Sequence, residues 1–232
     1  MQVPGRPGFA RLFREAGAVL DLARFPWNAP DLARQPRGEG EPVMVFPGFG
    51  AGDASTLPLR AYVRWLGYRV AGWGLGTNRG DVPDLIPQVT ERVVEQADRA
   101  GRAVRLVGWS LGGYLAREAA RERPEAVERV ITLGTPVVGG PKYTAVAGIY
   151  ERQGIDLDEI EAGVEARNRV PMEVPVTAVY SRSDAVVAWQ ACIDRHSREV
   201  EHVEVRSTHL GMGVSPDVYR IVAQRLARGR GP

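Results

Sequence analysis

The segment Val104-Arg105-Leu106-Val107-Gly108-Trp109-Ser110-Leu111-Gly112-Gly113 carries the strongest structural signal in the chain. A run of β-branched and apolar residues ends in the pattern Gly-x-Ser-x-Gly, and residues 114–120 continue with a helical pattern. A serine at such a strand-to-helix turn exposes its hydroxyl above the end of a sheet. The turn is so tight that side chains two residues to either side would collide, which explains Gly108 and Gly112.

Short apolar runs recur along the rest of the chain, and segments with helical periodicity separate most of them. The predicted strands are residues 43–46, 69–73, 104–109, 127–133, 174–180 and 202–206. The predicted helices are residues 55–66, 84–99, 111–123 and 215–228. Parallel neighbours need a crossover connection, which a helix supplies. The sequence therefore predicts an α/β fold with a mostly parallel central sheet, helices on both faces, and ligands at the carboxyl ends of the strands.

The first part of the chain has a different character. Within residues 8–24 the apolar positions recur at helical spacing, which predicts one amphipathic helix. We expect this helix either to pack on the domain or a substrate pocket, or to lie on a membrane surface. Residues 25–41 are rich in Pro and Gly and are predicted to form an extended connector. The 232-residue length then leaves residues 42–232 as one domain.

An insertion interrupts the alternation of strands and helices. Residues 137–172 lie between two predicted strands and contain Gly139-Gly140-Pro141 and a charged stretch. Long insertions in compact domains are often lids over a site. We expect residues 137–172 to form either a lid or a surface helix.

Composition excludes several classes of protein. With 44% hydrophobic and 25% charged residues the chain has the composition of a globular domain. Its 30 basic and 28 acidic residues are interleaved, so no basic face for nucleic acid is expected. The single cysteine, Cys192, excludes an intrachain disulfide, and the three scattered histidines offer no obvious metal site. No run approaches the ~18 apolar residues of a membrane span, and charges interrupt the N-terminal apolar residues, so we expect a cytoplasmic protein.

The Gly-x-Ser-x-Gly turn, its position between strand and helix, and Thr135-Pro136 after the next strand resemble the α/β-hydrolase superfamily, specifically its lipase/esterase-like members. The resemblance covers about residues 42–228 and leaves residues 1–41 unexplained. It implies the α/β-hydrolase fold with a short lid insertion, no cofactor, and a catalytic triad in the order nucleophile, acid, histidine.

The resemblance assigns Ser110 as the nucleophile and His209 as the general base. His209 lies in Ser207-Thr208-His209-Leu210-Gly211, a loop before the last predicted helix, which matches the histidine loop of the family. An imidazole can take the Ser110 proton and return it to the leaving group. The other two histidines, His196 and His202, are interpreted as surface residues.

The acid is expected after the strand at residues 174–180. Asp184 follows that strand and precedes small apolar residues, as in the family, and would orient and stabilise the imidazole of His209. The alternative role for Asp184 is a helix N-cap. Asp194 is the reserve candidate for the acid.

Two backbone amides are expected to form an oxyanion hole. The turn points the amide of Leu111 at the space beside Ser110, where a tetrahedral intermediate would carry its negative charge. The family places a second amide in the loop after the first strand, here Pro47-Gly48-Phe49, which assigns Phe49. In this loop Pro47 stands where lipases often carry histidine.

The lining of the site is predicted to be apolar. Four residues near predicted strand ends are the candidates for substrate binding, namely Trp73, Trp109, Val187 and Met212. The loop at residues 72–80 is rich in glycine, but its spacing does not fit a dinucleotide fingerprint. In that loop Asn78 and Arg79 are candidates for substrate contacts or for structural hydrogen bonds.

These assignments imply a serine hydrolase that cleaves carboxylic esters with an apolar acyl group, through an acyl-enzyme intermediate. The expected partner is a small-molecule or lipid-like ester, with a weak membrane-surface contact through the N-terminal helix as a further option. Thioesterase and acyltransferase activity would use the same triad. An α/β-hydrolase-fold binding module without catalysis is the alternative from another class.

Overall fold

The computed structural model describes residues 5–229 and is built on one parallel sheet of six strands. The strands lie in the order β2-β1-β3-β4-β5-β6, and every neighbouring pair is parallel. Their bounds are β1 Pro42–Phe46, β2 Arg69–Gly72, β3 Val104–Trp109, β4 Val127–Leu133, β5 Val176–Tyr180 and β6 Val200–Glu204. The carboxyl ends of all six strands therefore meet at one edge of the sheet.

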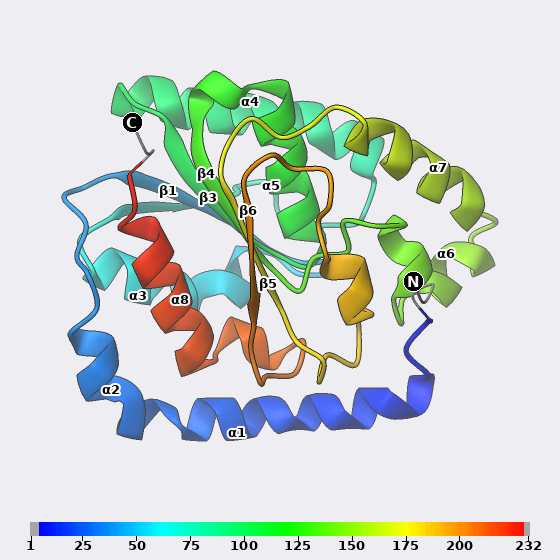
Figure 1. The fold of residues 1–232 in the computed structure, drawn as a ribbon, viewed down its shortest axis with the longest axis horizontal. Helices are drawn as coiled ribbons and strands as arrows, with labels where there is room; N and C mark the ends of the chain where they lie inside the picture. The colour runs from blue at the N-terminus through cyan, green and yellow to red at the C-terminus, as the bar shows by residue number, and fades with distance from the viewer. Residues whose placement is uncertain (1–4, 230–232) are drawn as a thin grey trace.

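Helices cover both faces of this sheet (Figure 1). Side chains at alternate positions of β1 point to opposite faces, because a strand has a side-chain period of two. Val43 and Val45 belong to the core formed with α3 (Leu57–Trp65) and α8 (Pro216–Leu226). Met44 and Phe46 belong to the core formed with α4 (Val82–Ala100) and α5 (Leu111–Glu122). The predicted α/β fold is confirmed, and each predicted strand and helix of the sheet lies within a few residues of its observed bounds.

The N-terminal helical segment, residues 9–33, consists of three consecutive pieces. A 3₁₀-helix, η1 (Phe9–Gly17), leads into α1 (Ala18–Ala23), and α2 (Phe25–Ala33) follows after a single residue. The prediction of an extended connector is wrong for residues 25–33. Pro26 lies in the first turn of α2, where a backbone N–H has no helical partner to lose, so this proline is compatible with a helix start. A second proline, Pro30, lies inside the short helix.

Over residues 13–21 the N-terminal helical segment presents its polar side to the domain, whereas Phe25 and Leu32 of α2 pack against the core formed with α3 and α8. Glu15 is only 6% exposed and Asp21 only 5%, whereas Phe13 is 82%, Leu20 71% and Trp27 81% exposed. This orientation is the reverse of an amphipathic helix packed through its apolar face. The side chains of residues 9–11 lie outside the described part of the structure. Within residues 5–229, no helix is long and apolar enough to cross a membrane.

The insertion at residues 137–172 is helical and is attached to the body of the domain. It contains η4 (Gly140–Tyr143), α6 (Ala147–Arg152) and α7 (Leu157–Asn168). Arg167 of α7 forms ion pairs with Glu118 and Glu122 of α5. The side-chain amide of Asn168 donates to the Val137 carbonyl at 2.9 Å. The remaining short 3₁₀-helices are η2 (Asp53–Thr56), η3 (Pro124–Ala126), η5 (Trp189–Cys192) and η6 (Gly211–Gly213).

Candidate active site

The turn between β3 and α5 places Ser110 at the carboxyl edge of the sheet. Among the non-glycine residues from 5 to 229, Ser110 is the one with a positive φ, at 55°. Backbone strain of this kind persists only where the surroundings hold it. The Ser110 N–H donates to the Leu133 carbonyl at 2.8 Å, and the Thr135 hydroxyl donates to the Ser110 carbonyl at 2.9 Å. Bonds from β4 and the loop after it therefore hold the turn in place.

The turn requires glycine at positions 108 and 112, because there is no space for a Cβ atom at either position. A Cβ at Gly108 would lie 2.3 Å from the Cα of Gly113. A Cβ at Gly112 would lie 2.5 Å from the carbonyl oxygens of Phe46 and Pro47. Both distances are far inside van der Waals contact, so the close approach of β3, α5 and the loop after β1 depends on these two glycines.

Asp184 and His209 form a buried hydrogen-bonded pair. The Nδ1 atom of His209 lies 2.7 Å from Oδ2 of Asp184, and both residues are buried. The other oxygen of Asp184 accepts from the N–H groups of Val186 and Val187, at 2.8 and 2.7 Å. The carboxylate is thereby fixed on the loop after β5. This arrangement makes Nδ1 the protonated nitrogen and leaves Nε2 of His209 available to accept a proton.

Two opposing effects act on the pKa of His209. Burial disfavours the imidazolium, but the charge and hydrogen bond of Asp184 and the charge of Glu15 favour it. The attraction outweighs the burial, so the pKa of His209 is raised above its ordinary value.

The Ser110 turn and the His209 loop are in direct contact. The indole N–H of Trp109, the residue before Ser110, donates to the His209 carbonyl at 3.2 Å. Within residues 5–229, no hydrogen bond joins the Ser110 hydroxyl to His209. Gly134 lies beneath the Asp184–His209 pair with φ +56°, and a Cβ there would lie 3.0 Å from Nδ1 of His209. The structure therefore brings the three predicted triad residues to one place.

The loop after β1 lies against Ser110. A Cβ at Gly48 would be 3.2 Å from the Ser110 Cβ and 3.9 Å from its hydroxyl oxygen. Among the described residues, the backbone N–H groups of Phe49 and Leu111 form no hydrogen bond with the protein. An oxyanion hole needs unpaired backbone amides next to the nucleophile, so both amides are free for this predicted role.

The glycine-rich loop at residues 72–80 supports the loop after β1. Asn78 is fully buried, and its side-chain amide donates to the Pro47 carbonyl at 3.0 Å. Its backbone carbonyl accepts from the Gly50 N–H at 2.7 Å. Asn78 therefore makes structural hydrogen bonds, which is one of the two roles considered for it. The side chain of Arg79 is exposed.

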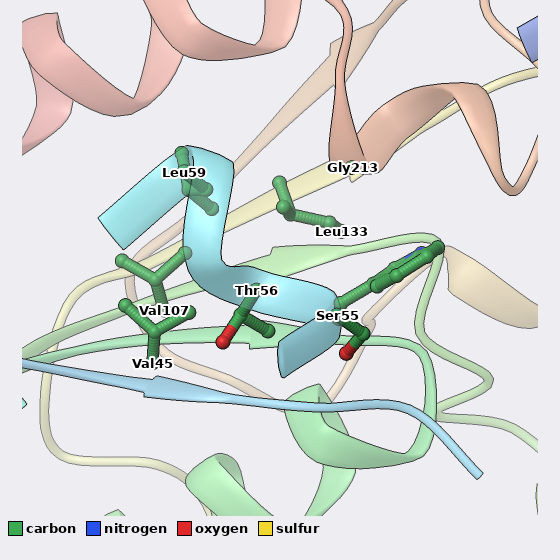
Figure 2. Close-up of a pocket in the computed structure, with 8 residues that line it drawn as sticks. Val45, Ser55, Thr56, Leu59, Val107, Leu133 and Gly213 are labelled. Atoms are coloured by element: carbon green, nitrogen blue, oxygen red, sulfur yellow. The ribbon is translucent and has the colours of Figure 1, made fainter. Parts of the chain in front are cut away.

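A small apolar cavity lies next to the Ser110 turn, because Trp109 is part of its lining. Figure 2 shows the side chains that line it. It has a volume of about 10 Å³, which is space for about one water molecule. Its lining includes Trp109 and Leu133, the residue whose carbonyl holds Ser110, and the complete lining is Val45, Ser55, Thr56, Leu59, Val107, Trp109, Leu133 and Gly213.

Of the four predicted substrate-binding residues, Trp109 lines this cavity. Trp73 and Met212 are 1% and 0% exposed, and they lie in the cores on opposite faces of the sheet. Val187 is buried in a separate cluster with Tyr143. The structure therefore does not bring these four side chains together, and their part in substrate binding stays a prediction.

The reserve acid Asp194 and His202 have other partners. Asp194 forms a buried ion pair with Arg117 and accepts a hydrogen bond from the Ser197 hydroxyl. The Asp194 N–H donates to Nε2 of His202 at 3.0 Å. These contacts make Asp194 part of the packing between α5 and the segment before β6, and His209 is paired with Asp184 instead.

Two acidic residues near the site were missed from the sequence. Glu15 accepts hydrogen bonds from the backbone N–H groups of Ala185, His209 and Leu210. Asp21 accepts from the Ser207 hydroxyl at 2.7 Å. Both residues lie on the polar side of a predicted amphipathic helix, where a carboxylate is ordinarily exposed. No pattern in the sequence marks them.

No family model matches this sequence. A pimeloyl-[acyl-carrier protein] methyl ester esterase of Edwardsiella ictaluri is 42% identical over 72 residues, which cover 31% of this chain and 25% of that relative. The chain is thus matched to only a quarter of the length of this relative. A mitochondrial palmitoyl-protein thioesterase, ABHD10 of Bos taurus, is 22% identical over 225 residues, covering 84% of this chain and 73% of the relative.

Solved structures of the same architecture include lipolytic and esterase proteins. A structure of the metagenome-derived lipolytic enzymes LipS and LipT has a TM-score of 0.62 at 18% identity, covering 83% of this chain and 94% of that chain. The parallel sheet, the strained serine turn and this similarity define an α/β-hydrolase fold. Within that class, the structural neighbours of the chain are lipolytic and esterase α/β-hydrolases.

Proposed function

We propose that this protein is a serine hydrolase that cleaves carboxylic esters with an apolar acyl group. The observation that carries the proposal is the convergence of the strained Ser110 turn and the buried Asp184–His209 pair at one edge of the sheet. The esterases and the thioesterase among its relatives support the same reaction class.

The mechanism follows from this geometry. His209 Nε2 takes the proton of the Ser110 hydroxyl as its oxygen attacks the ester carbonyl. Asp184 holds the imidazole through Nδ1 and stabilises the imidazolium. The N–H groups of Leu111 and Phe49 donate to the oxyanion of the tetrahedral intermediate. His209 then gives its proton to the leaving alcohol, and water hydrolyses the acyl-enzyme by the same steps.

The apolar cavity beside Trp109 supports an apolar acyl group. Its walls come from residues on the carboxyl halves of β1, β3 and β4 and from η2, α3 and the loop at Gly213. The cavity has space for about one water-sized group, so it could hold only the tip of an acyl chain bound to Ser110. We propose that residues 137–172 form a lid. Arg167 attaches this insertion to α5 through its ion pair with Glu118.

A specific observation favours thioester hydrolysis as the second candidate. A palmitoyl-protein thioesterase is similar to this chain over 84% of its length. The triad and the oxyanion hole serve an ester and a thioester alike, because both pass through a tetrahedral oxyanion.

The exposed side of the N-terminal helical segment supports contact with an anionic membrane surface. Phe13, Leu20 and Trp27 project away from the domain, Arg14 is exposed along the same segment, and Arg34 is exposed directly after it. Glu15 and Asp21 face inward, so the outward side combines apolar and cationic groups. This combination binds the interface of anionic bilayers.

The test is hydrolysis of a p-nitrophenyl ester series from acetate to palmitate, with Ser110→Ala and Thr77→Ala measured in parallel. We expect Ser110→Ala to lose at least a thousandfold in kcat. Thr77→Ala, which removes an exposed hydroxyl, should keep the wild-type rate. Ser110→Ala activity close to wild type would refute the assignment, and thioesters of matched chain length decide between the two candidates.

A further inference from the structure

Glu15 connects the two loops that carry the acid and the base. Its Oε1 accepts from the Ala185 N–H at 3.0 Å and from the His209 N–H at 3.2 Å. Its Oε2 accepts from the Leu210 N–H at 2.7 Å. The residue is 6% exposed, so these three backbone groups have replaced the water around its carboxylate.

The two loops come from different strands and need such a connection. Asp184 follows β5, and His209 follows β6 and precedes η6. The hydrogen bond between their side chains is one link between the loops, and Glu15 supplies a second link through the backbone. Donors in two loops that share one carboxylate cannot move apart without leaving a buried N–H unpaired.

Charged and titratable groups around His209 can be named individually. The Asp184 carboxylate is hydrogen-bonded to Nδ1 of His209, and the charge of Glu15 also raises the pKa of the imidazole. Asp21 accepts a hydrogen bond from the Ser207 hydroxyl in the same loop. Cys192 lies near Asp184, and burial raises the pKa of its thiol, so it stays neutral.

We propose that Glu15 is a positioning residue for the base, and that the N-terminal helical segment is therefore part of the active site. Glu15 fixes the backbone of His209 against the loop of Asp184 and places a second negative charge beside the imidazole. The expected effect of Glu15 on catalysis rests on the proposed function. Its effect on the protonation of His209 is independent of any substrate.

The experiment compares Glu15→Gln with Asp21→Asn in the full chain. Glutamine has nearly the same shape as glutamate, but it is neutral, and its amide nitrogen cannot accept from a backbone N–H. Asp21→Asn neutralises the other buried carboxylate of the same segment and serves as the matched control. The readouts are the His209 ring titration by NMR, the pH profile of kcat/KM, and kcat and KM at the optimum.

In Glu15→Gln we expect the His209 pKa and the acid limb of kcat/KM to move together to lower pH. We expect kcat to fall about 10- to 100-fold with little change in KM, because the base is misplaced. In Asp21→Asn the titration of His209 should match the wild type. An unchanged His209 titration in folded Glu15→Gln overturns the inference. A shift in a protein that hydrolyses no ester supports the role of Glu15 and counts against the proposed function.

A second variant covers the case in which Glu15→Gln does not fold. Glu15→Asp keeps the negative charge but is one methylene shorter, so it cannot reach all three N–H groups. We expect its His209 titration to stay closer to the wild type while kcat falls. Wild-type kcat in Glu15→Asp would contradict the positioning role.

Discussion

Glu15 and His209 lie 194 positions apart in the chain, and the carboxylate of Glu15 accepts a hydrogen bond from the backbone N–H of His209 at 3.2 Å. The contact joins the N-terminal helical segment to the loop of the predicted base. A segment that the family resemblance left unexplained therefore reaches the centre of the site.

Asp184 is expected to act on the tautomer of His209. In Asp184→Asn the side chain can present an amide N–H to Nδ1, which would leave the proton on Nε2 and prevent it from accepting from Ser110. We expect kcat to fall on the order of 10⁴-fold. Steady-state hydrolysis of a short p-nitrophenyl ester checks this, and activity within tenfold of the wild type would contradict it.

Asp194 is expected to affect stability and to leave the chemistry intact. Asp194→Asn leaves the Arg117 guanidinium buried without its carboxylate, which costs about 3–5 kcal/mol in the free energy of unfolding. Urea unfolding measures this loss. The rate per folded molecule should remain near wild type, and a 10⁴-fold loss in kcat would make Asp194 the acid instead.

The same ion pair predicts a pH dependence of stability. Burial opposes the ionised form of Asp194, but Arg117 and the hydrogen bonds to Ser197 and His196 outweigh it and hold the pKa of this carboxyl well below its usual range. A carboxyl whose pKa is lowered by folding contributes stability above its pKa in the unfolded chain, about 4. This contribution is lost as the pH falls toward its pKa in the folded protein. Melting temperatures between pH 7 and pH 3 should therefore drop more steeply for the wild type than for Asp194→Asn.

Gly134 is expected to be intolerant of a side chain. Its φ is +56°, and a Cβ would lie 3.0 Å from Nδ1 of His209 and 3.1 Å from Oδ2 of Asp184. Gly134→Ala should therefore lose activity as well as about 1–2 kcal/mol of stability. Gly101→Ala is the matched control, because Gly101 has φ +63° and nothing within 4 Å of its Cβ position. Equal kcat in the two variants would show that the contact with the Asp184–His209 pair is unimportant.

Membrane contact is expected to depend on the exposed apolar side chains of the N-terminal helical segment. Leu20→Glu places a negative charge at a position that is 71% exposed, and it should reduce co-sedimentation with phosphatidylglycerol vesicles at least tenfold. Val170→Glu alters an exposed apolar residue elsewhere and should bind like the wild type. Equal binding by both variants, or no preference of the wild type for anionic over neutral vesicles, would refute the proposal.

Local patterns in the sequence determined the sheet and the serine turn, and the family resemblance added Asp184 and His209 to Ser110 as the predicted triad. Hydrophobic periodicity and the glycines around Ser110 act over a few residues, so they can be read without knowing the rest of the fold. The Pro-rich residues 25–33 were predicted wrongly because Pro26 was counted as a helix breaker, although in a first turn it has no hydrogen bond to lose.

Tertiary structure decided which side of the N-terminal helical segment is buried. Periodicity shows that a helix has two different sides, but it does not show what lies opposite them. The loops after β5 and β6 present backbone N–H groups to the segment, and a carboxylate satisfies these donors where an apolar side chain cannot. Glu15 therefore faces inward and Leu20 faces outward, because buried donors at the carboxyl edge of the sheet require an acceptor.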